Sequence, residues 1–391
     1  MTTARYQTEA WPTREQELLL RAALLRGPDA VQAWNEWKSA VDIDRLDAGS
    51  YRLLPLLYKN LQQQGVQKPV LDKYKEVYRE TWYKNRLLFR DMARLLGSFH
   101  DAGLPTLVLK GAPLVLLYYK DYGLRPMADF DVLVRTRDAL RAFGLLKSLG
   151  WKPPPRYRES EIPIRHGTSF KNGARRQFDL HWHAIQECCA IDADDDFWRS
   201  AAPLRIDDAP TSTLNPADHL LQVCAHGVRW NIVPTFRWVA DAIAIMNEAK
   251  SQLDWDRLLA QTRKRRLMWP MKEALGYLRE RFDAPIPAPV LEAVQKIPAA
   301  RTERFEYLCR SEYRRRKLLG QLPILWFNYR RLADGASQGE SMNFLKYLQL
   351  AWRLDRPQQI ALHAFLKSLR CVARVLPWIG ARWAKMPALK R

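Results

Sequence analysis

The residues best suited to chemistry form a short acidic string, Asp129-Phe130-Asp131, which runs into the apolar segment Val132-Leu133-Val134. Side chains two positions apart on a strand point to the same face, so we expect the two carboxylates side by side. Carboxylate oxygens are ligands that Mg²⁺ prefers, and two metal ions about 3.5–4 Å apart can hold the attacking and leaving oxygens of a phosphoryl displacement. An isolated Asp-x-Asp is also common at solvated strand ends, so the neighbouring residues must distinguish a metal site from a solvated strand end.

A lysine-glycine turn precedes this string. Residues 104–109 predict a short strand that ends at Lys110-Gly111, and residues 112–120 predict a helix. Free N–H groups at a helix N-terminus bind phosphate, and Lys110 would add positive charge; the alternative is an ordinary strand-to-helix turn. Only one helix and one loop separate Gly111 from Asp129. The two strands are therefore expected to be neighbours, with the turn and the aspartates at one end.

A third carboxylate comes from a predicted hairpin. Residues 162–170 and 175–183 alternate like strands, and Asn172-Gly173 between them favours a type I′ turn. Asp179, His181 and His183 would then share a face, and Asp179 could complete a metal site or be a plain polar strand residue. Two imidazoles at this spacing can also share zinc. For both histidines we favour a supporting role, orienting a carboxylate or contacting substrate.

Three further polar residues have two readings each. Arg125, in the turn before the acidic string, could contact a phosphate or the metal-binding carboxylates, or it could tie the turn to a helix carbonyl. His226 and Asp241 lie on separate predicted helices and could pair with one another, with a structural role favoured. The acidic run of residues 192–196 is expected to be a flexible loop.

The surrounding pattern predicts an α+β fold. Residues 13–100 read as helices, with Thr13 as an N-cap and a long helix over residues 69–102. Residues 103–184 are the only part that looks rich in strands, and helices resume after the cap Asn215-Pro216. We predict an N-terminal helical region (1–100), a mixed-sheet core (101–200), a helical domain packing on the core (201–300) and a basic helical C-terminal region (301–391).

The charge is concentrated at the C-terminus. Of the net charge of +21, residues 301–391 supply +13. Clusters such as residues 314–317 (Arg-Arg-Arg-Lys) and a basic amphipathic helix over 358–375 are candidates for contact with RNA or an anionic membrane surface. The alternative is a helix packed on the body with a solvated basic face. No apolar stretch is long enough to span a bilayer, no signal peptide is visible, and the five cysteines form no disulfide-like pattern. We therefore expect a cytoplasmic protein, with peripheral membrane contact as the variant.

These strings together resemble a known family. The matching segments are Val108-Leu-Lys-Gly-Ala-Pro, Tyr122-Gly-Leu-Arg-Pro-Met-Ala-Asp-Phe-Asp-Val-Leu-Val, Phe178-Asp-Leu-His-Trp-His, the helix opening at Leu214-Asn-Pro-Ala-Asp-His, Phe236-Arg-Trp-Val-Ala-Asp241 and Leu253-Asp-Trp-Asp. They look like the bacterial "uncharacterised nucleotidyltransferase" family of the DNA polymerase β-like superfamily, over roughly residues 15–285. The resemblance implies a polymerase β-like core in which Asp129 and Asp131 bind metal and Asp179 completes the site.

The same resemblance implies a Mg²⁺-dependent enzyme, with two ions expected, that moves a nucleoside monophosphate from an NTP to an unidentified acceptor and releases pyrophosphate. Lys110, Gly111 and Arg125 are the expected nucleotide contacts. One departure concerns the turn: the wider superfamily places a serine or glycine after its glycine, whereas this chain has Ala112. The alternative function is a non-catalytic binder of nucleotide, RNA or a membrane surface that works through the basic C-terminal region.

Overall fold

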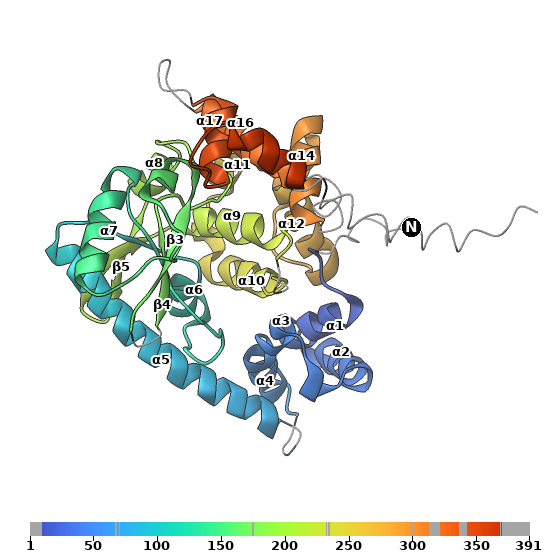
Figure 1. Ribbon diagram of the computed structural model, residues 1–391. Coiled ribbons are helices and arrows are strands. Elements are labelled where there is room, and N and C mark those ends of the chain that lie inside the picture. Colours follow the sequence, from blue (N-terminus) through green and yellow to red (C-terminus); the bar gives the residue numbers. More distant parts are fainter. Residues whose placement is uncertain are drawn as a thin grey trace, which may run out of the picture.

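The computed structural model describes residues 10–367 and 369, apart from 67, 68, 70, 174, 175, 232, 234, 299, 313–320 and 336–341. A mixed sheet lies beside a body of helices, and the N-terminal helices form a group at the edge of that body (Figure 1). This arrangement confirms the prediction of an α+β fold in which a small mixed sheet is flanked by helices.

The N-terminal region is helical, as predicted. It contains α1 (Arg14–Leu24), α2 (Gly27–Ala40), α3 (Ala48–Tyr51), α4 (Leu54–Gln63) and the long α5 (Asp72–Asp101). Thr13 caps α1 in a reciprocal box: its hydroxyl accepts from the Gln16 N–H at 3.3 Å, and the Gln16 side chain accepts from the Thr13 N–H at 3.0 Å. α5 runs from the N-terminal helices along the sheet, so it joins the two parts (Figure 1).

The sheet has six strands in the order β3-β4-β2-β1-β6-β5. Their bounds are β1 (Leu107–Leu109), β2 (Asp131–Leu133), β3 (Gly167–Lys171), β4 (Gln177–His181), β5 (Ala202–Ile206) and β6 (Ala209–Thr213). β1 is antiparallel to β2 and parallel to β6, β2 is parallel to β4, and the β3–β4 and β5–β6 pairs are antiparallel hairpins. The predicted adjacency of β1 and β2 is confirmed.

Two strand predictions were wrong. The β5–β6 hairpin was missed, because Ala, Pro, Ser and Thr over residues 209–213 show no strong apolar alternation; pairing with β1 makes β6 a strand. Residues 159–164 form a 3₁₀-helix in place of a strand, with Pro163 inside it, and β3 begins only at Gly167. Proline cannot donate a ladder hydrogen bond, so the apolar alternation there was misleading. The sheet thus reaches Thr213, while the four-part domain division stays a prediction.

Alternate residues of the central strands enter two different cores. Val108 and Val132 pack with aromatic and aliphatic residues of α5 and α7 (Ala139–Ser148), among them Phe89 and Phe143. Residues on the opposite face, including Leu107, Leu109 and Leu133, join the cluster built by the N-terminal helices and α9 (Pro216–Gly227), α10 (Trp238–Ala249) and α12 (Met268–Phe282). Asp131 has the strand parity of Leu133, so its side chain is on the α9–α10 side.

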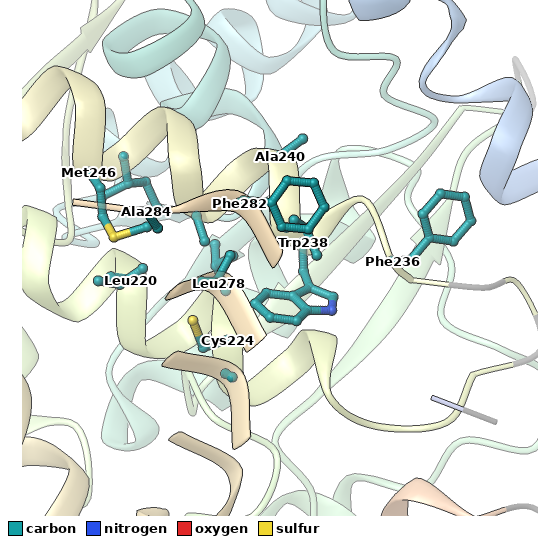
Figure 2. Close-up of a cluster of buried hydrophobic side chains, with 14 of the residues drawn as sticks. Leu220, Cys224, Phe236, Trp238, Ala240, Met246, Leu278, Phe282 and Ala284 are labelled. Carbon is teal, nitrogen blue, oxygen red and sulfur yellow. The ribbon is translucent and has the colours of Figure 1, made fainter. Parts of the chain in front are cut away.

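The helices on that side pack closely. Side chains of α9, α10 and α12, including Cys224, Trp238 and Leu278, converge in one buried cluster (Figure 2). A Cβ added at Gly227 would lie 2.0 Å from Trp238 Cγ, so a side chain there would push the start of α10 away from α9. This close approach fixes the segment around residue 237, which faces the sheet end described below. α11 (Trp255–Lys264) and α13 (Ala288–Lys296) complete this layer.

The C-terminal region continues as α14 (Arg301–Ser311), α16 (Leu322–Asp334) and α17 (Phe344–Ala351), with a further helical stretch over residues 359–367. It is tied to the core by Arg353, whose Nε lies 2.8 Å from Glu161 Oε1. In the last stretch Leu362 and Phe365 are 62% and 60% exposed, so these two residues of the predicted apolar stripe do not pack on the described body. Residues 314–317 and 370–375 of the predicted basic surfaces lie outside the described residues. Within the described part, no helix combines the length and apolarity needed to cross a membrane.

Candidate active site

The antiparallel pairing of β1 with β2 brings the lysine-glycine turn to the acidic string. Leu109, the last residue of β1, is opposite Asp131, the first residue of β2. Lys110 follows with φ of 52°, a left-handed conformation that is uncommon for a residue with a side chain. Its Nζ donates to Asp131 Oδ1 at 2.6 Å. The predicted meeting of these two motifs at one sheet end is confirmed.

The parallel pairing of β2 with β4 adds Asp179 and His181. Asp131 is in register with Asp179, and His181 Nε2 lies 2.9 Å from Asp131 Oδ1. Asp131, Asp179 and His181 each present one potential ligand atom, and these atoms lie within 4.8 Å of one another. Asp129 is not part of that trio, because β2 begins only at Asp131 and Asp129 lies in the preceding loop. The expectation that the two aspartates share one strand was therefore wrong, although both line the same cavity.

Two of the three carboxylates lack partners. Asp179 Oδ1 is buried without a hydrogen bond, and the half-buried Asp129 carboxylate has no hydrogen-bond or ion-pair partner within the described part of the chain. Burial and the negative charges of Asp131 and Asp179 raise the pKa of Asp129 to about 6. At Asp131 burial also opposes ionisation, but Lys110 and His181 outweigh it and lower the pKa. Unsatisfied buried carboxylate oxygens beside one another are suited to a cation.

The aspartates open into a cavity of about 320 Å³. Its walls come from four places: the sheet end with Lys110 and Gly111, the loop over residues 125–129, α9 with the start of α10, and the N-terminal region through Arg52. Gln222 and His226 contribute from α9. Burial and the charges of Arg229 and Lys110 lower the pKa of His226 to about 3, so its ring is neutral at pH 7. Acidic groups thus occupy one end of a cavity with several cationic groups on its walls.

Arg125 and Asp241 form a buried ion pair. Arg125 Nε and Nη2 donate to the two Asp241 oxygens at 2.8 and 2.9 Å, and the Tyr119 hydroxyl donates to Asp241 at 2.9 Å. Asp241 therefore pairs with Arg125, and the expected pairing with His226 was wrong. The Arg125 guanidinium thus binds a carboxylate and not a helix carbonyl, and two of its nitrogens are already engaged. A side chain at position 111 would crowd the Arg125 guanidinium, because a Cβ added to Gly111 would lie 2.9 Å from Arg125 Nη1.

His183 is separated from the cavity. β4 ends at His181, and His183 Nδ1 lies 2.7 Å from Asp194 Oδ2, with both side chains buried. Asp194 Oδ1 also accepts from the Ala184 N–H at 3.0 Å. The flexible loop expected over residues 192–196 was therefore wrong: Asp194 anchors the chain after β4, and the run leads into α8 (Asp195–Arg199). Of the two histidines, only His181 reaches the carboxylates.

Sequence reasoning missed two cationic residues of the cavity, Arg52 and Arg237. Arg237 lies inside the string Phe236-Arg-Trp-Val-Ala-Asp241 that carried the family resemblance, so a signal was present. Arg52 follows α3 in a region read only as helical, and no local pattern singled it out. Both line the same cavity as the three aspartates.

Comparison with known proteins identifies the family of this chain. No curated protein matches the sequence. One similar solved structure is described as an antigenic nucleotidyltransferase-like protein from Paracoccidioides brasiliensis; it is 15% identical, and the match covers 54% of this chain and 92% of that chain at a TM-score of 0.32, too low to argue from. The sequence model of a family described as "Uncharacterised nucleotidyltransferase" matches residues 42–283, well over half of the chain and all of the elements that line the cavity. The chain therefore belongs to this nucleotidyltransferase family.

Proposed function

We propose that this protein is a Mg²⁺-dependent nucleotidyltransferase that moves a nucleoside monophosphate from an NTP to an acceptor hydroxyl and releases pyrophosphate. Family membership supports the reaction class. The observation that carries the proposal further is the set of carboxylates at one end of a cation-lined cavity, two of them without any partner in the described structure. A solvated strand end would not bury Asp179 Oδ1 unsatisfied.

The donor set fits Mg²⁺. Asp129, Asp131 and Asp179 offer hard oxygen ligands, and the cavity supplies no cysteine beside them. We assign the metal to these three residues, with two ions expected. His181 acts through Asp131: its Nε2 donates to Oδ1 and thereby holds the carboxylate in one orientation. Asp179, with an unpaired oxygen beside Asp131, is the residue best placed to accept the proton of the attacking hydroxyl.

The cationic groups complete the proposed mechanism. Mg²⁺ bound here would polarise the phosphate under attack and neutralise the charge that develops on the leaving pyrophosphate. The Lys110 ammonium balances the charge of Asp131 and lines the same cavity as the carboxylates. The Arg125–Asp241 pair holds the loop before Asp129 against α10, so it positions the carboxylates. Catalysis is then a matter of positioning and charge neutralisation.

A thermal-shift screen tests the proposal. The full chain is heated with ATP, CTP, GTP or UTP, each with and without Mg²⁺. A nucleotide present at about one hundred times its Kd stabilises the folded state by about 2.7 kcal/mol, so at least one Mg·NTP should raise the melting temperature. Loss of that shift without Mg²⁺, or in Asp131→Asn, supports the assigned site. If no nucleotide shifts the melting temperature under any condition, the proposed activity is contradicted and the non-catalytic alternative is favoured.

A further inference from the structure

Two arginines in the cavity lack an acidic partner. Arg52 is the C-cap residue of α3, where its backbone N–H donates to the Ser50 carbonyl; its side chain makes no hydrogen bond or ion pair within the described residues. Arg237, which immediately precedes α10, makes one polar contact there: its Nη1 donates to the Pro126 carbonyl at 2.8 Å. Within the described part of the chain neither guanidinium has a carboxylate within ion-pair distance, although both line the same cavity. Buried or half-buried guanidinium groups without a counter-ion are uncommon in a finished structure.

The other two cations of the cavity are already engaged. Lys110 is bound to Asp131, and both oxygens of Asp241 are bound by Arg125. Burial and the neighbouring charges of Arg125 and Arg52 lower the pKa of Arg237 to about 9, while Asp241 opposes that shift. Lys110 and Arg125 are thus bound to two of the carboxylates of the cavity, while neither Arg52 nor Arg237 is bound to a carboxylate among the described residues. An anionic ligand would relieve the repulsion between these guanidinium groups.

We propose that Arg52 and Arg237 form a phosphate subsite in this cavity. A guanidinium presents several donors in a planar fork that matches two oxygens of one phosphate group. The inference deepens the proposed function, on which it rests, because it moves phosphate recognition from Arg125 to this pair. One cavity of about 320 Å³ contains the pair and the three aspartates, so a single ligand can contact both. The polyphosphate of an NTP has the required charge, and a phosphate monoester on the acceptor offers the same chemistry.

The subsite links the N-terminal helices to the site. Arg52 comes from the turn between α3 and α4, whereas Arg237 is held in place by the close contact of α9 with α10 at Gly227 and Trp238. The buried residues of α4, α9 and α10 belong to one continuous core, which ties the helix that follows Arg52 to the helices on either side of Arg237. The N-terminal region therefore supplies part of the site as well as a covering layer.

Isothermal titration of the full chain with magnesium tripolyphosphate, MgATP and AMP tests the subsite. Arg52→Gln and Arg237→Gln are compared with Arg45→Gln, a matched control whose side chain is 87% exposed in the same segment. Loss of one charged hydrogen-bonding group should weaken tripolyphosphate and MgATP binding about ten- to a hundredfold, with the Arg45 variant unchanged. Each variant's melting temperature without ligand is recorded; Arg52→Gln removes no side-chain hydrogen bond or ion pair within the described residues, so it should fold like the wild type.

The outcomes separate the subsite from the activity. If both variants bind tripolyphosphate and MgATP with wild-type affinity, the subsite is overturned. The transferase proposal stands in that case, because MgATP still binds. The subsite is also overturned if the wild type binds none of the three phosphate compounds. Arginine-dependent binding of tripolyphosphate without binding of any Mg·NTP supports the subsite and counts against the transferase. Equal arginine dependence for AMP supports a subsite for a single phosphate, as on an acceptor.

Discussion

Replacing Asp131 or Asp179 by asparagine should abolish transfer in both cases, yet change stability in opposite directions. Both side chains are assigned to the metal, so each substitution removes one charged ligand of the ion that would neutralise the charge on the phosphates. Removing one preorganised group of this kind costs about 10²–10³-fold in turnover, or about 2.7–4 kcal/mol. Their surroundings differ, because Asp131 is paired and Asp179 is not. Stability measured without metal or nucleotide should therefore separate the two variants.

Asp131→Asn should destabilise the metal-free protein. The Lys110–Asp131 contact at 2.6 Å corresponds to about 6 kcal/mol of gross attraction at an effective dielectric constant of about 20. Desolvation offsets much of this, and breaking one side of a buried pair typically costs about 3–5 kcal/mol. The Lys110 side chain is 28% exposed and has Asp129 nearby, so we expect the lower end, about 3 kcal/mol.

Asp179→Asn should leave the metal-free protein as stable as the wild type or stabilise it by about 1 kcal/mol, because a buried polar group without a partner costs about 1–3 kcal/mol. The substitution removes a charge that has no counter-ion and that repels Asp129 and Asp131. The asparagine amide still has to be desolvated, which limits the gain. Site residues that trade stability for function commonly behave in this way.

Urea unfolding with EDTA, beside a transfer assay with labelled NTP, checks both variants. Leu140→Ala provides a control for handling, since that side chain is 58% exposed and lies on α7, outside the residues that line the cavity. Wild-type turnover in Asp131→Asn would remove the central claim. A loss of about 3 kcal/mol in Asp179→Asn would show that its carboxylate has a structural partner, which contradicts the reading of Asp179 as an unpaired ligand.

Four further predictions follow from the same contacts. Lys110→Ala should weaken NTP binding by about 1–3 kcal/mol if its ammonium leaves Asp131 for the phosphates; unchanged affinity by calorimetry would restrict Lys110 to structure. Asp241→Asn should lower the unfolding free energy by about 3–5 kcal/mol, because Arg125 is left buried and unpaired; an unchanged urea midpoint would contradict this. Burial lowers the pKa of His219 to about 3, so the neutral ring stabilises the fold above pH 6.5, and this contribution is lost as the pH falls toward 3. Between pH 7 and pH 5, His219→Gln should therefore lose about 2 kcal/mol less unfolding free energy than the wild type does. Replacing residues 314–317 by glutamine should weaken any salt-sensitive binding to RNA or to anionic vesicles and leave transfer intact, and a wild type that binds neither at low salt would make this region a solvated surface.

Local chemistry determined much of the site. The N-cap at Thr13, the Asn215 cap of α9 and the strand parity of Asp179 and His181 are short-range features, and each was predicted correctly. The meeting of Lys110 with Asp131 was predicted as well, because a short connection between two strands leaves few arrangements. The sequence alone therefore placed three aspartates and one lysine near a single sheet end.

Other features depended on partners distant in the chain. β6 is a strand because it pairs with β1, and residues 209–213 contain no periodicity that predicts a strand. Arg125 could bond a phosphate, a carboxylate or a carbonyl with equal chemical ease. Its partner is Asp241, 116 residues later, which accepts from Nε and Nη2 of the guanidinium. A side chain's hydrogen-bonding capacity is local, but its partner is not.

The same reasoning explains which arginines are free for a ligand. The sequence determined that the chain has the carboxylates of a nucleotidyltransferase and a large excess of basic residues. It could not determine which of those cations are neutralised within the fold. Only packing decided that Lys110 and Arg125 are paired while Arg52 and Arg237 face the cavity without a carboxylate. Ion pairs depend on distances of a few ångströms between groups far apart in the chain, and those distances are set by the tertiary structure.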